Sequence, residues 1–398
     1  MYKNTYRRGP SRPGVQSFSG SNRRNRKNAK QTIDPSRFIK AAAPVSTVGY
    51  EPKHNFADFE MHPLLKSNVT NKGYTVPSEI QDKTITLGLA GQNVVGIANT
   101  GTGKTAAFAL PILNTLMRNP SSQALVIAPT RELAIQIEEQ CRILAKNSGL
   151  SAAVLIGGMP LGRQKRDLKD GSRLIIGTPG RIKDHLNQHT LDLSHCGMVV
   201  LDEVDRMLDM GFINDVRFIL EKLPTEHQAF FFSATMSPEI NALIDTFSRD
   251  AVTVNVKVAE TSQNVHQDVV RFSGNVDKID SLHNVLIQPN VQKTLIFGKT
   301  KHGVERLSRE LRARGFKSES MHGDKSQGQR KRALDSFRDN QIKVLVATDV
   351  AARGIDVKDI THVINYDVPQ TYDDYVHRIG RAGRAGQAGY ALTFVDKG

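Results

Sequence analysis

The feature that most constrains this chain is a glycine-rich run that ends in lysine and threonine, Ala98-Asn99-Thr100-Gly101-Thr102-Gly103-Lys104-Thr105. A short apolar segment precedes the run at 93–97, and a helical pattern continues from it through Leu110. A strand, a tight turn and a helix in this order direct backbone N–H groups toward an anion. Lys104 would reach the phosphates of a nucleoside triphosphate, and Thr105 would offer its hydroxyl to Mg²⁺.

Two carboxylates, Asp202 and Glu203, follow the apolar run 198–201. An open α/β sheet binds ligands outside the carboxyl ends of its strands, so we expect both side chains beside the glycine-rich run. Asp202 would hold Mg²⁺ directly or through water, and Glu203 would orient and deprotonate the attacking water. The alternative is a glycine-rich turn without a nucleotide, because Ala98 replaces the first glycine of the generic loop. The acidic strand end favours the nucleotide site.

Short apolar runs alternate with helical patterns from about residue 56 onward, which predicts α/β units with covered, mainly parallel sheets. The pattern fades through 250–275 and then restarts, so we expect two domains, over 51–255 and 262–398. The apolar runs lie at 93–97, 124–128, 174–176, 198–201 and 229–232 in the first domain, and at 294–297, 344–347 and 362–365 in the second.

The net charge of +14 is distributed unevenly. Residues 1–50 contain eleven Lys or Arg and one acid, which gives +10 and leaves +4 for the rest of the chain. The segment Tyr2 to Lys30 is poor in aliphatic residues and cannot bury enough apolar area to offset its ordering entropy. We therefore expect residues 1–50 to form a disordered basic arm that attracts a phosphate backbone. A solubilising tail or an arm for an acidic partner is the alternative.

Two cysteines, Cys141 and Cys196, do not support a disulfide framework, which favours a cytoplasmic location. The first 30 residues lack the apolar core of a secretory signal, and the sequence offers no stretch apolar enough to span a bilayer. These features predict no membrane partner.

Over residues 54–396 the chain resembles the DEAD-box RNA helicases, because a dozen motifs occur in the order of that family. The resemblance implies two tandem RecA-like parallel-sheet domains behind the basic arm, with ATP and Mg²⁺ as cofactors. The acidic box reads Asp202-Glu203-Val204-Asp205, with valine where the family usually has alanine. We expect activity to survive, with crowding behind the Mg²⁺ site. Asn99 and Ala382 also depart from the usual residues.

Residues 54–82 resemble the adenine-reading Q motif of the family. The resemblance implies that Phe56 stacks on adenine and that Gln81 hydrogen-bonds its exposed edge. An amide can donate and accept at the same time, which suits that edge. Without the other motifs, the same residues would be interpreted as the start of a helix.

The resemblance also assigns contacts to the RNA backbone. These residues are Pro129, Thr130, Arg131, Gly157, Gly158, Thr178, Pro179, Gly180 and Arg181 in the first domain, and His322, Gly323, Asp324, Gln327, Arg330 and Thr348 in the second. Hydroxyls, helix N-termini and arginine suit phosphate oxygens, which carry no sequence information. Helix capping and turn formation are the alternative, and both roles are compatible.

Three further roles come from the resemblance alone. Ser233 and Thr235 would couple the acidic box to RNA through Asp205 and His377. Asp356 would approach the ribose hydroxyl. Arg381 and Arg384 would be the arginine fingers, which supply roughly 10³–10⁵-fold in rate in related chemistry. An ordinary solvated helix face is the alternative for arginines spaced three apart. Relatives usually continue beyond the last residues here with a final helix, so we expect a short second domain or a truncated chain.

The sequence thus predicts a monomeric RNA-dependent ATPase that separates short RNA duplexes locally or remodels RNA–protein complexes. Contacts to phosphate and sugar imply little sequence preference. Two other functions stay open: an ATP-dependent clamp on RNA that does not unwind, and a DNA-directed translocase of the same superfamily. The Gln81 motif and the closing run from His377 to Arg381 argue against the translocase.

Overall fold

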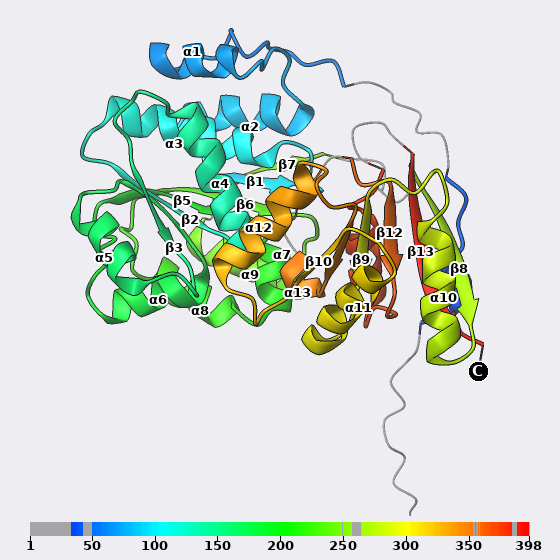
Figure 1. Cartoon of the computed structure of the whole chain (residues 1–398). Coiled ribbons are helices and arrows are strands. Elements are labelled where there is room, and N and C mark those ends of the chain that lie inside the picture. The colour runs from blue at the N-terminus through cyan, green and yellow to red at the C-terminus, as the bar shows by residue number, and fades with distance from the viewer. Residues whose placement is uncertain are drawn as a thin grey trace, which may run out of the picture.

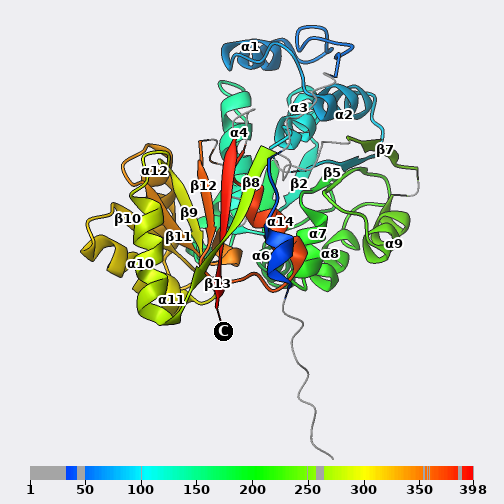
Figure 2. The ribbon, with the colours of Figure 1, turned by 90° about the vertical axis from the view of Figure 1, so that its right-hand side faces the viewer.

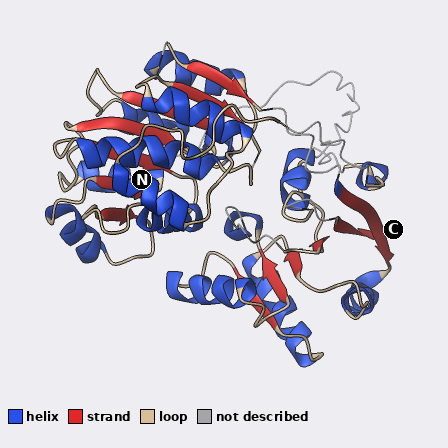
Figure 3. Ribbon diagram, turned by 90° about the horizontal axis from the view of Figure 1, so that it is seen from above, coloured by secondary structure: helices blue, strands red, loops and turns tan. Residues whose placement is uncertain are grey.

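The computed structural model consists of two α/β lobes that lie side by side (Figures 1 and 3). It describes residues 33–42, 50–99, 101–248, 250–256, 264–352, 355, 357, 359–383 and 388–397. Among these residues, none of the helices combines the length and the apolar character needed to cross a bilayer.

The first lobe contains a seven-stranded parallel sheet in the order β3-β4-β2-β5-β6-β1-β7. Because the strands are parallel, their carboxyl ends meet at one edge of the sheet, where the loops after β1, β5 and β6 lie together. The strands are β1 Val94–Ile97, β2 Gln123–Ile127, β3 Ala152–Leu155, β4 Leu174–Gly177, β5 Cys196–Leu201, β6 Gln228–Ser233 and β7 Val252–Asn255.

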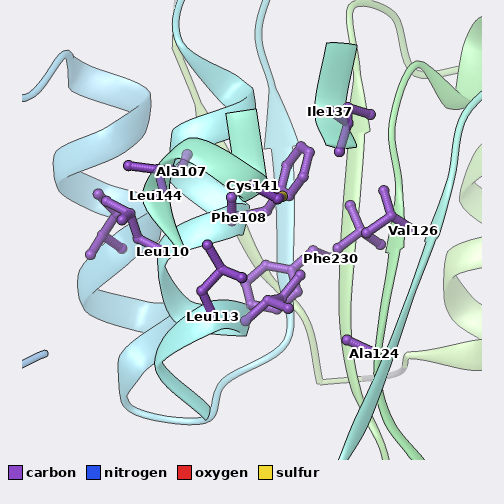
Figure 4. Close-up of a cluster of buried hydrophobic side chains, with 14 of the residues drawn as sticks. Ala107, Phe108, Leu110, Leu113, Ala124, Val126, Ile137, Cys141, Leu144 and Phe230 are labelled. Atoms are coloured by element: carbon purple, nitrogen blue, oxygen red, sulfur yellow. The ribbon is translucent and has the colours of Figure 1, made fainter. Parts of the chain in front are cut away.

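Helices cover both faces of this sheet, which explains why its strands are apolar on both sides. Successive residues of β6 point to opposite faces, so that Phe230 and Phe231 belong to different buried clusters. Figure 4 shows the cluster in which Phe108 of α3 and Val126 of β2 accompany Phe230. The helices are α1 Pro63–Asn71, α2 Glu79–Leu89, α3 Lys104–Arg118, α4 Arg131–Leu144, α5 Leu161–Lys169, α6 Pro179–Asn187, α7 Val204–Asp209, α8 Ile213–Leu220 and α9 Pro238–Phe247.

The second lobe contains a six-stranded parallel sheet in the order β10-β11-β9-β12-β13-β8. The predicted fold class, two parallel-sheet α/β units, is confirmed. The strands are β8 Val265–Phe272, β9 Thr294–Phe297, β10 Ser318–Met321, β11 Val344–Ala347, β12 His362–Asn365 and β13 Gly389–Asp396. The helices are α10 Gly274–Leu286, α11 Lys301–Ala313, α12 Gln327–Arg338, α13 Asp349–Ala352 and α14 Tyr372–Ile379.

The N-terminal region differs in part from the expected disordered arm. Tyr2 to Lys30 lie outside the described residues, but residues 33–40 are ordered on the second lobe. They include the 3₁₀ helix η1, Pro35–Phe38, whose N-cap Asp34 accepts a hydrogen bond from the Ser36 amide at 2.9 Å. Phe38 is completely buried. The prediction of disorder came from the average composition of the arm, which does not register the contribution of a single residue. Phe38 alone carries enough apolar surface to fix a short segment.

Candidate nucleotide and RNA site

The glycine-rich loop connects β1 to α3 at the carboxyl edge of the first sheet. The Ala98 amide donates to the Ser233 carbonyl at 3.0 Å, which ties the start of the loop to the end of β6. Gly101 and Gly103 have φ values of 86° and 93°, a left-handed conformation that glycine adopts without strain. Lys104 begins α3 and is buried, and its Nζ donates to the Ala98 carbonyl at 3.1 Å. The predicted loop residue Thr100 lies outside the described residues.

Gln81 lies against this loop. Its Nε2 donates to the Gly103 carbonyl at 3.1 Å, and its Oε1 accepts from the Ser78 amide at 2.9 Å. The Ser78 hydroxyl donates to the Thr102 carbonyl at 2.7 Å. A β-carbon on Gly103 would clash with the Gln81 amide, so this position needs glycine for contact as well as for its backbone angle. One donor and one acceptor site of the amide stay available for an adenine edge.

Phe56, the predicted adenine-stacking residue, is buried near the start of the first lobe. Its ring packs edge-to-face on Phe59, with centroids 6.0 Å apart, and lies tilted against Tyr74 at 5.2 Å. The Phe56 amide donates to the Thr75 carbonyl at 3.0 Å. These contacts fix the position of the Phe56 ring. Phe56 and Gln81 both belong to residues 54–82, the segment that resembles the Q motif.

The acidic box follows β5 directly. The Asp202 amide donates to the Ile127 carbonyl at 3.0 Å, and its side chain is buried. Burial raises the pKa of the Asp202 carboxyl to about 6, although the positive charge of Lys104 opposes the shift; the neighbouring charge of Glu203 adds to it. Asp202 Oδ1 has no hydrogen-bond partner among the described atoms. A buried carboxylate oxygen without a partner fits a ligand of a divalent cation such as Mg²⁺.

Glu203 has φ 56° and ψ 56°, which places a non-glycine residue in the left-handed region. Such a conformation costs of order 1–3 kcal/mol and concentrates at functional sites. Val204, the residue that departs from the usual alanine, is fully buried among the apolar side chains on one face of the first sheet. The expected crowding behind the Mg²⁺ site stays a prediction.

Asp205 joins the acidic box to the loop after β6. Its Oδ2 accepts hydrogen bonds from the amides of Ala234 and Thr235, both at 3.0 Å, and from the Thr235 hydroxyl at 3.3 Å. The Ser233 hydroxyl donates to the Thr235 carbonyl at 2.6 Å. A movement of the loop after β6 is therefore transmitted to the Asp205 carboxylate, and Asp205 belongs to the same acidic box as Asp202.

A pocket between the lobes brings Arg206 of the first lobe together with Asp349, His377, Arg378 and Arg381 of the second. Burial, with a smaller contribution from the charge of Arg206, lowers the pKa of His377 to about 4, while Asp205 acts in the opposite direction. His377 is therefore neutral at pH 7, and its Nδ1 has no hydrogen-bond partner among the described atoms. The predicted coupling residues of the two lobes, Asp205 and His377, therefore lie close enough for the carboxylate charge to influence protonation of the imidazole.

Two arginines of this pocket have different surroundings. Arg378 binds Asp349 through two hydrogen bonds of 2.6 and 2.8 Å and also donates to Asn365 at 3.1 Å. Arg381 is buried and donates to the Ile355 carbonyl at 2.8 Å. Arg378 therefore braces α14 within the second lobe. The other predicted finger, Arg384, and the predicted ribose contact, Asp356, lie outside the described residues.

The RNA-side residues predicted in the first lobe form three helix starts and turns. The Thr130 hydroxyl caps α4 by accepting from the Leu133 amide at 3.3 Å. The guanidinium of Arg131 lies over Gly157 and Gly158, where a β-carbon would clash with it. Thr178, Pro179 and Gly180 stand at the start of α6, and Arg181 Nε lies 3.4 Å from Asp184. Pro129 precedes α4 and is buried.

In the second lobe, three of the predicted RNA residues follow β10. His322 Nε2 lies 3.1 Å from Glu305, and the exposed Asp324 pairs with Lys301 at 2.7 Å. A hydrogen bond from Ser320 lowers the pKa of Glu305 to about 2, so its negative charge persists. Gly323 is exposed between them, and Thr348 precedes α13. Nothing in the local sequence indicated Glu305 or Lys301 as partners.

Gln327 and Arg330 do not face an open surface but the first lobe. Arg330 Nη2 lies 2.7 Å from Glu132 Oε2, and both side chains are buried. The two groups do not align as a hydrogen bond, since Oε2 and Arg330 Nε have no such partner. Gln327 Nε2 donates to Glu132 Oε1 at 3.3 Å. Figure 1 shows α12, which carries both residues, beside α4. Sequence reasoning missed this interface, although Glu132 stands within a motif it had singled out.

The fold and the site define a two-lobed P-loop nucleoside triphosphatase, with one lobe carrying the loop and the acidic box and the other facing them with arginine and histidine. Two family matches agree with this class. Residues 78–243 match the DEAD/DEAH box helicase family, and residues 277–386 match the helicase conserved C-terminal domain.

Individual relatives extend the match. The ATP-dependent RNA helicase CshA of Limosilactobacillus reuteri is 44% identical over 342 residues, which cover 85% of this chain and 69% of that protein; the DEAD-box ATP-dependent RNA helicase CshA of Bacillus subtilis gives the same figures. The structure of S. cerevisiae Dbp5 bound to RNA and ADP BeF3 superposes with a TM-score of 0.75 at 30% identity, covering 86% of this chain and 90% of that one. The chain belongs to the DEAD-box family of ATP-dependent RNA helicases.

Proposed function

We propose that this DEAD-box helicase hydrolyses ATP fast only when its lobes close together on RNA, and that closure separates short duplexes or remodels RNA–protein complexes. The observation that carries the proposal is the chain of contacts from the acidic box to the second lobe. Asp205 holds Thr235 by hydrogen bonds and lies within electrostatic reach of His377. A group on the RNA side can therefore alter the geometry of the hydrolytic side.

The residues of the first lobe would divide the chemistry among them. Lys104 would leave the Ala98 carbonyl and neutralise charge on the β- and γ-phosphates. Glu203, at a strained position beside Asp202, would accept the proton of the attacking water. Gln81 would transmit the presence of adenine to the loop, since its amide already contacts Gly103.

Asp202 and Thr105 would hold Mg²⁺, which when bound supplies charge neutralisation at the phosphates. The residues fit such an ion, because Asp202 Oδ1 is buried without a partner and Thr105 lies in the first turn of α3. Arg381 would exchange its bond to the Ile355 carbonyl for the transferring phosphoryl group once nucleotide is bound, and it would act only while the lobes lie together.

The RNA would run along the strand ends of both lobes, past Arg131 and Thr178 in the first and His322 and Thr348 in the second. Backbone contacts of this kind distinguish RNA from DNA through the 2′-hydroxyl and carry little sequence preference.

The test compares ATP turnover with no nucleic acid, with a single-stranded RNA oligomer and with the DNA oligomer of identical sequence. We expect RNA to raise the turnover at least tenfold and DNA to leave it near the basal rate. Equal rates with and without RNA contradict the proposal, and equal stimulation by DNA favours the translocase. Release of a labelled strand from a short RNA duplex then separates unwinding from clamping.

A further inference from the structure

Residues 33–40, which we name the N-terminal anchor, lie on the second lobe although they precede the first lobe in the chain (Figure 2). Phe38 is fully buried, and its ring centroid lies 4.7 Å from that of Tyr375. Ile379 of α14 and Val265 of β8 belong to the same buried cluster. A side chain of this size that is withdrawn entirely from water fixes the segment that carries it.

The backbone of the anchor also pairs with the edge of the second sheet. The Lys40 amide donates to the Gln267 carbonyl at 3.0 Å, and the Gln267 amide donates to the Lys40 carbonyl at 2.8 Å. Gln267 lies on β8, the edge strand of that sheet, and its Oε1 accepts from the Tyr375 hydroxyl at 3.0 Å. The guanidinium of Arg37 lies 4.0 Å above the ring of Tyr372. The anchor therefore binds β8 and α14 together.

Helix α14 stands between the anchor and the inter-lobe pocket. Tyr375 and Ile379, spaced four residues apart, belong to the cluster around Phe38. His377 and Arg378, from the same helix, line the pocket, and so does Arg381, two residues beyond its end. A helix is rigid over one or two turns, so a shift on the anchor side displaces the groups on the pocket side.

The chain returns to the first lobe soon after the anchor. The Tyr50 hydroxyl donates to Asp82 Oδ2 at 2.7 Å, and the Lys53 amide donates to the same oxygen at 2.7 Å. Asp82 directly follows Gln81, the residue that contacts the glycine-rich loop. Lys40 and Tyr50 are thus fixed on different lobes only ten positions apart in sequence.

We propose that Phe38 is a positioning residue for ATP hydrolysis. By packing between β8 and α14, it fixes the position of α14, and thereby holds His377 and Arg381 opposite the nucleotide-binding edge of the first lobe. The inference rests on the proposed function, in which Arg381 acts across the lobes. Phe38 is not among the residues assigned to nucleotide or RNA above, and in this proposal it acts through Tyr375 and Ile379.

The test uses the full chain with Phe38→Ala, and with Ile39→Ala as a matched control, because Ile39 is adjacent and 53% exposed. We expect Phe38→Ala to lower the RNA-stimulated kcat roughly tenfold, since misplaced catalytic groups cost up to about 10²-fold. The KM for ATP should change less than about twofold, because the loop and Gln81 are untouched. A purely structural role would instead reduce the folded fraction, which a titration with a fluorescent ATP analogue reports as fewer binding sites per chain, whereas a lower kcat at full binding stoichiometry identifies positioning. Phe38→Leu should restore most of the turnover.

A second variant keeps the core intact. Lys40→Pro removes the amide that donates to Gln267 while leaving Phe38 in place. We expect an intermediate loss of kcat, so the proposal stays testable if Phe38→Ala does not fold. An unchanged kcat in both variants overturns the proposal, and so does an increase, which would make the anchor a restraint on catalysis.

Amide hydrogen exchange over residues 372–379 separates this inference from the proposed function. Exchange should be faster in Phe38→Ala than in the wild type and unchanged in Ile39→Ala. If the wild type shows no stimulation by RNA, the proposed function fails, while faster exchange still supports the anchor. Equal exchange in the wild type and Phe38→Ala overturns the inference whatever the turnover.

Discussion

Two neighbouring residues at the end of β5 are each energetically unfavourable, one in its side chain and the other in its backbone. Asp202 is buried with one carboxylate oxygen unpartnered, and Glu203 adopts a left-handed backbone conformation that suits glycine. Each state is costly in the free protein, and a bound nucleotide with its metal ion would relieve the first. Apolar residues at these two positions would make the free protein more stable. The fold therefore keeps the two carboxylates at a cost in stability, which suits a role in ligand binding.

Replacing Glu203 with glutamine should leave nucleotide affinity within about twofold and lower kcat by roughly 10²–10⁴-fold, the range for loss of a general base. Glutamine keeps the size of the side chain and the backbone strain, but it does not accept the proton of water at neutral pH. Binding of a fluorescent ATP analogue and steady-state turnover measure the two effects. Glu221→Gln, at an exposed position after α8, is the control. Unchanged turnover would refute the assigned base.

The sequence alone predicted most residues of this edge, because Lys104, Asp202 and Glu203 belong to motifs whose residues lie close together in the chain. It could not predict that Gln81 supports the loop at Gly103 or that Glu305 orients His322. Those contacts depend on how separate elements pack, which no local pattern records. The burial of Arg330 against Glu132 was missed for the same reason.

At the scale of elements, the strands that sequence patterns predicted are buried ones with continuous apolar runs, such as β5 and β11. The strands it missed have other patterns. β8 is an edge strand with alternating exposed and buried residues within the region where the apolar pattern fades, and β10 is rich in serine. Helix α14 shows why element type is not enough: its sequence reveals a helix, but only packing places His377 beside Arg206.

Because His377 on α14 is held neutral, closure of the lobes should depend on pH. The ordinary pKa of histidine is 6.5, and that of His377 in the closed structure is about 4. Separation of the lobes would hydrate His377 and return its pKa toward 6.5, so that between these values the open form would bind a proton that the closed form does not. Closure is therefore fully favourable above pH 6.5 and weakens as pH falls toward 4, by up to about 1.4 kcal/mol per pH unit.

The measurement is the affinity for an RNA oligomer, with a non-hydrolysable ATP analogue, at pH 7.5 and 5.5. His377→Gln is neutral at both values and should lose less affinity on acidification than the wild type. The charged neighbours Asp205, Arg206, Arg381 and Asp374 and the carboxyl of Asp202 are present in both proteins, so the difference belongs to His377. Equal losses in the two proteins would show that this imidazole does not titrate on closure.

At the scale of the whole molecule, a buried pair of charges, Glu132 on α4 and Arg330 on α12, joins the two lobes. Burial raises the pKa of Glu132 and lowers that of Arg330, so each charge is costly to bury and is offset mainly by the other. A pair of this kind adds little net stability compared with apolar residues, but breaking it leaves one charge uncompensated. The pair therefore restricts how the lobes can close. If the lobes met in another register, both charges would be buried without a partner.

Removing either partner alone should open the lobes. The buried charge left by Glu132→Met or Arg330→Met would cost about 3–5 kcal/mol if it stayed dry, so the lobes separate to hydrate it. The double variant removes both charges and should recover much of the closed population, a non-additive result. Energy transfer between dyes on exposed positions of the two lobes reports the separation in the presence of RNA and an ATP analogue.

The control comes from the same helix. Lys331 pairs with Asp335 at 3.1 Å, but Lys331 is exposed, and exposed pairs contribute only about 0–1 kcal/mol. Lys331→Met should therefore leave the lobe separation unchanged although it also removes a positive charge from α12. If it opens the lobes as far as Arg330→Met, the effect comes from the overall charge of the helix. If neither single variant at 132 or 330 opens them, closure depends on the His377 pocket and on RNA, and the Glu132–Arg330 pair merely accompanies it.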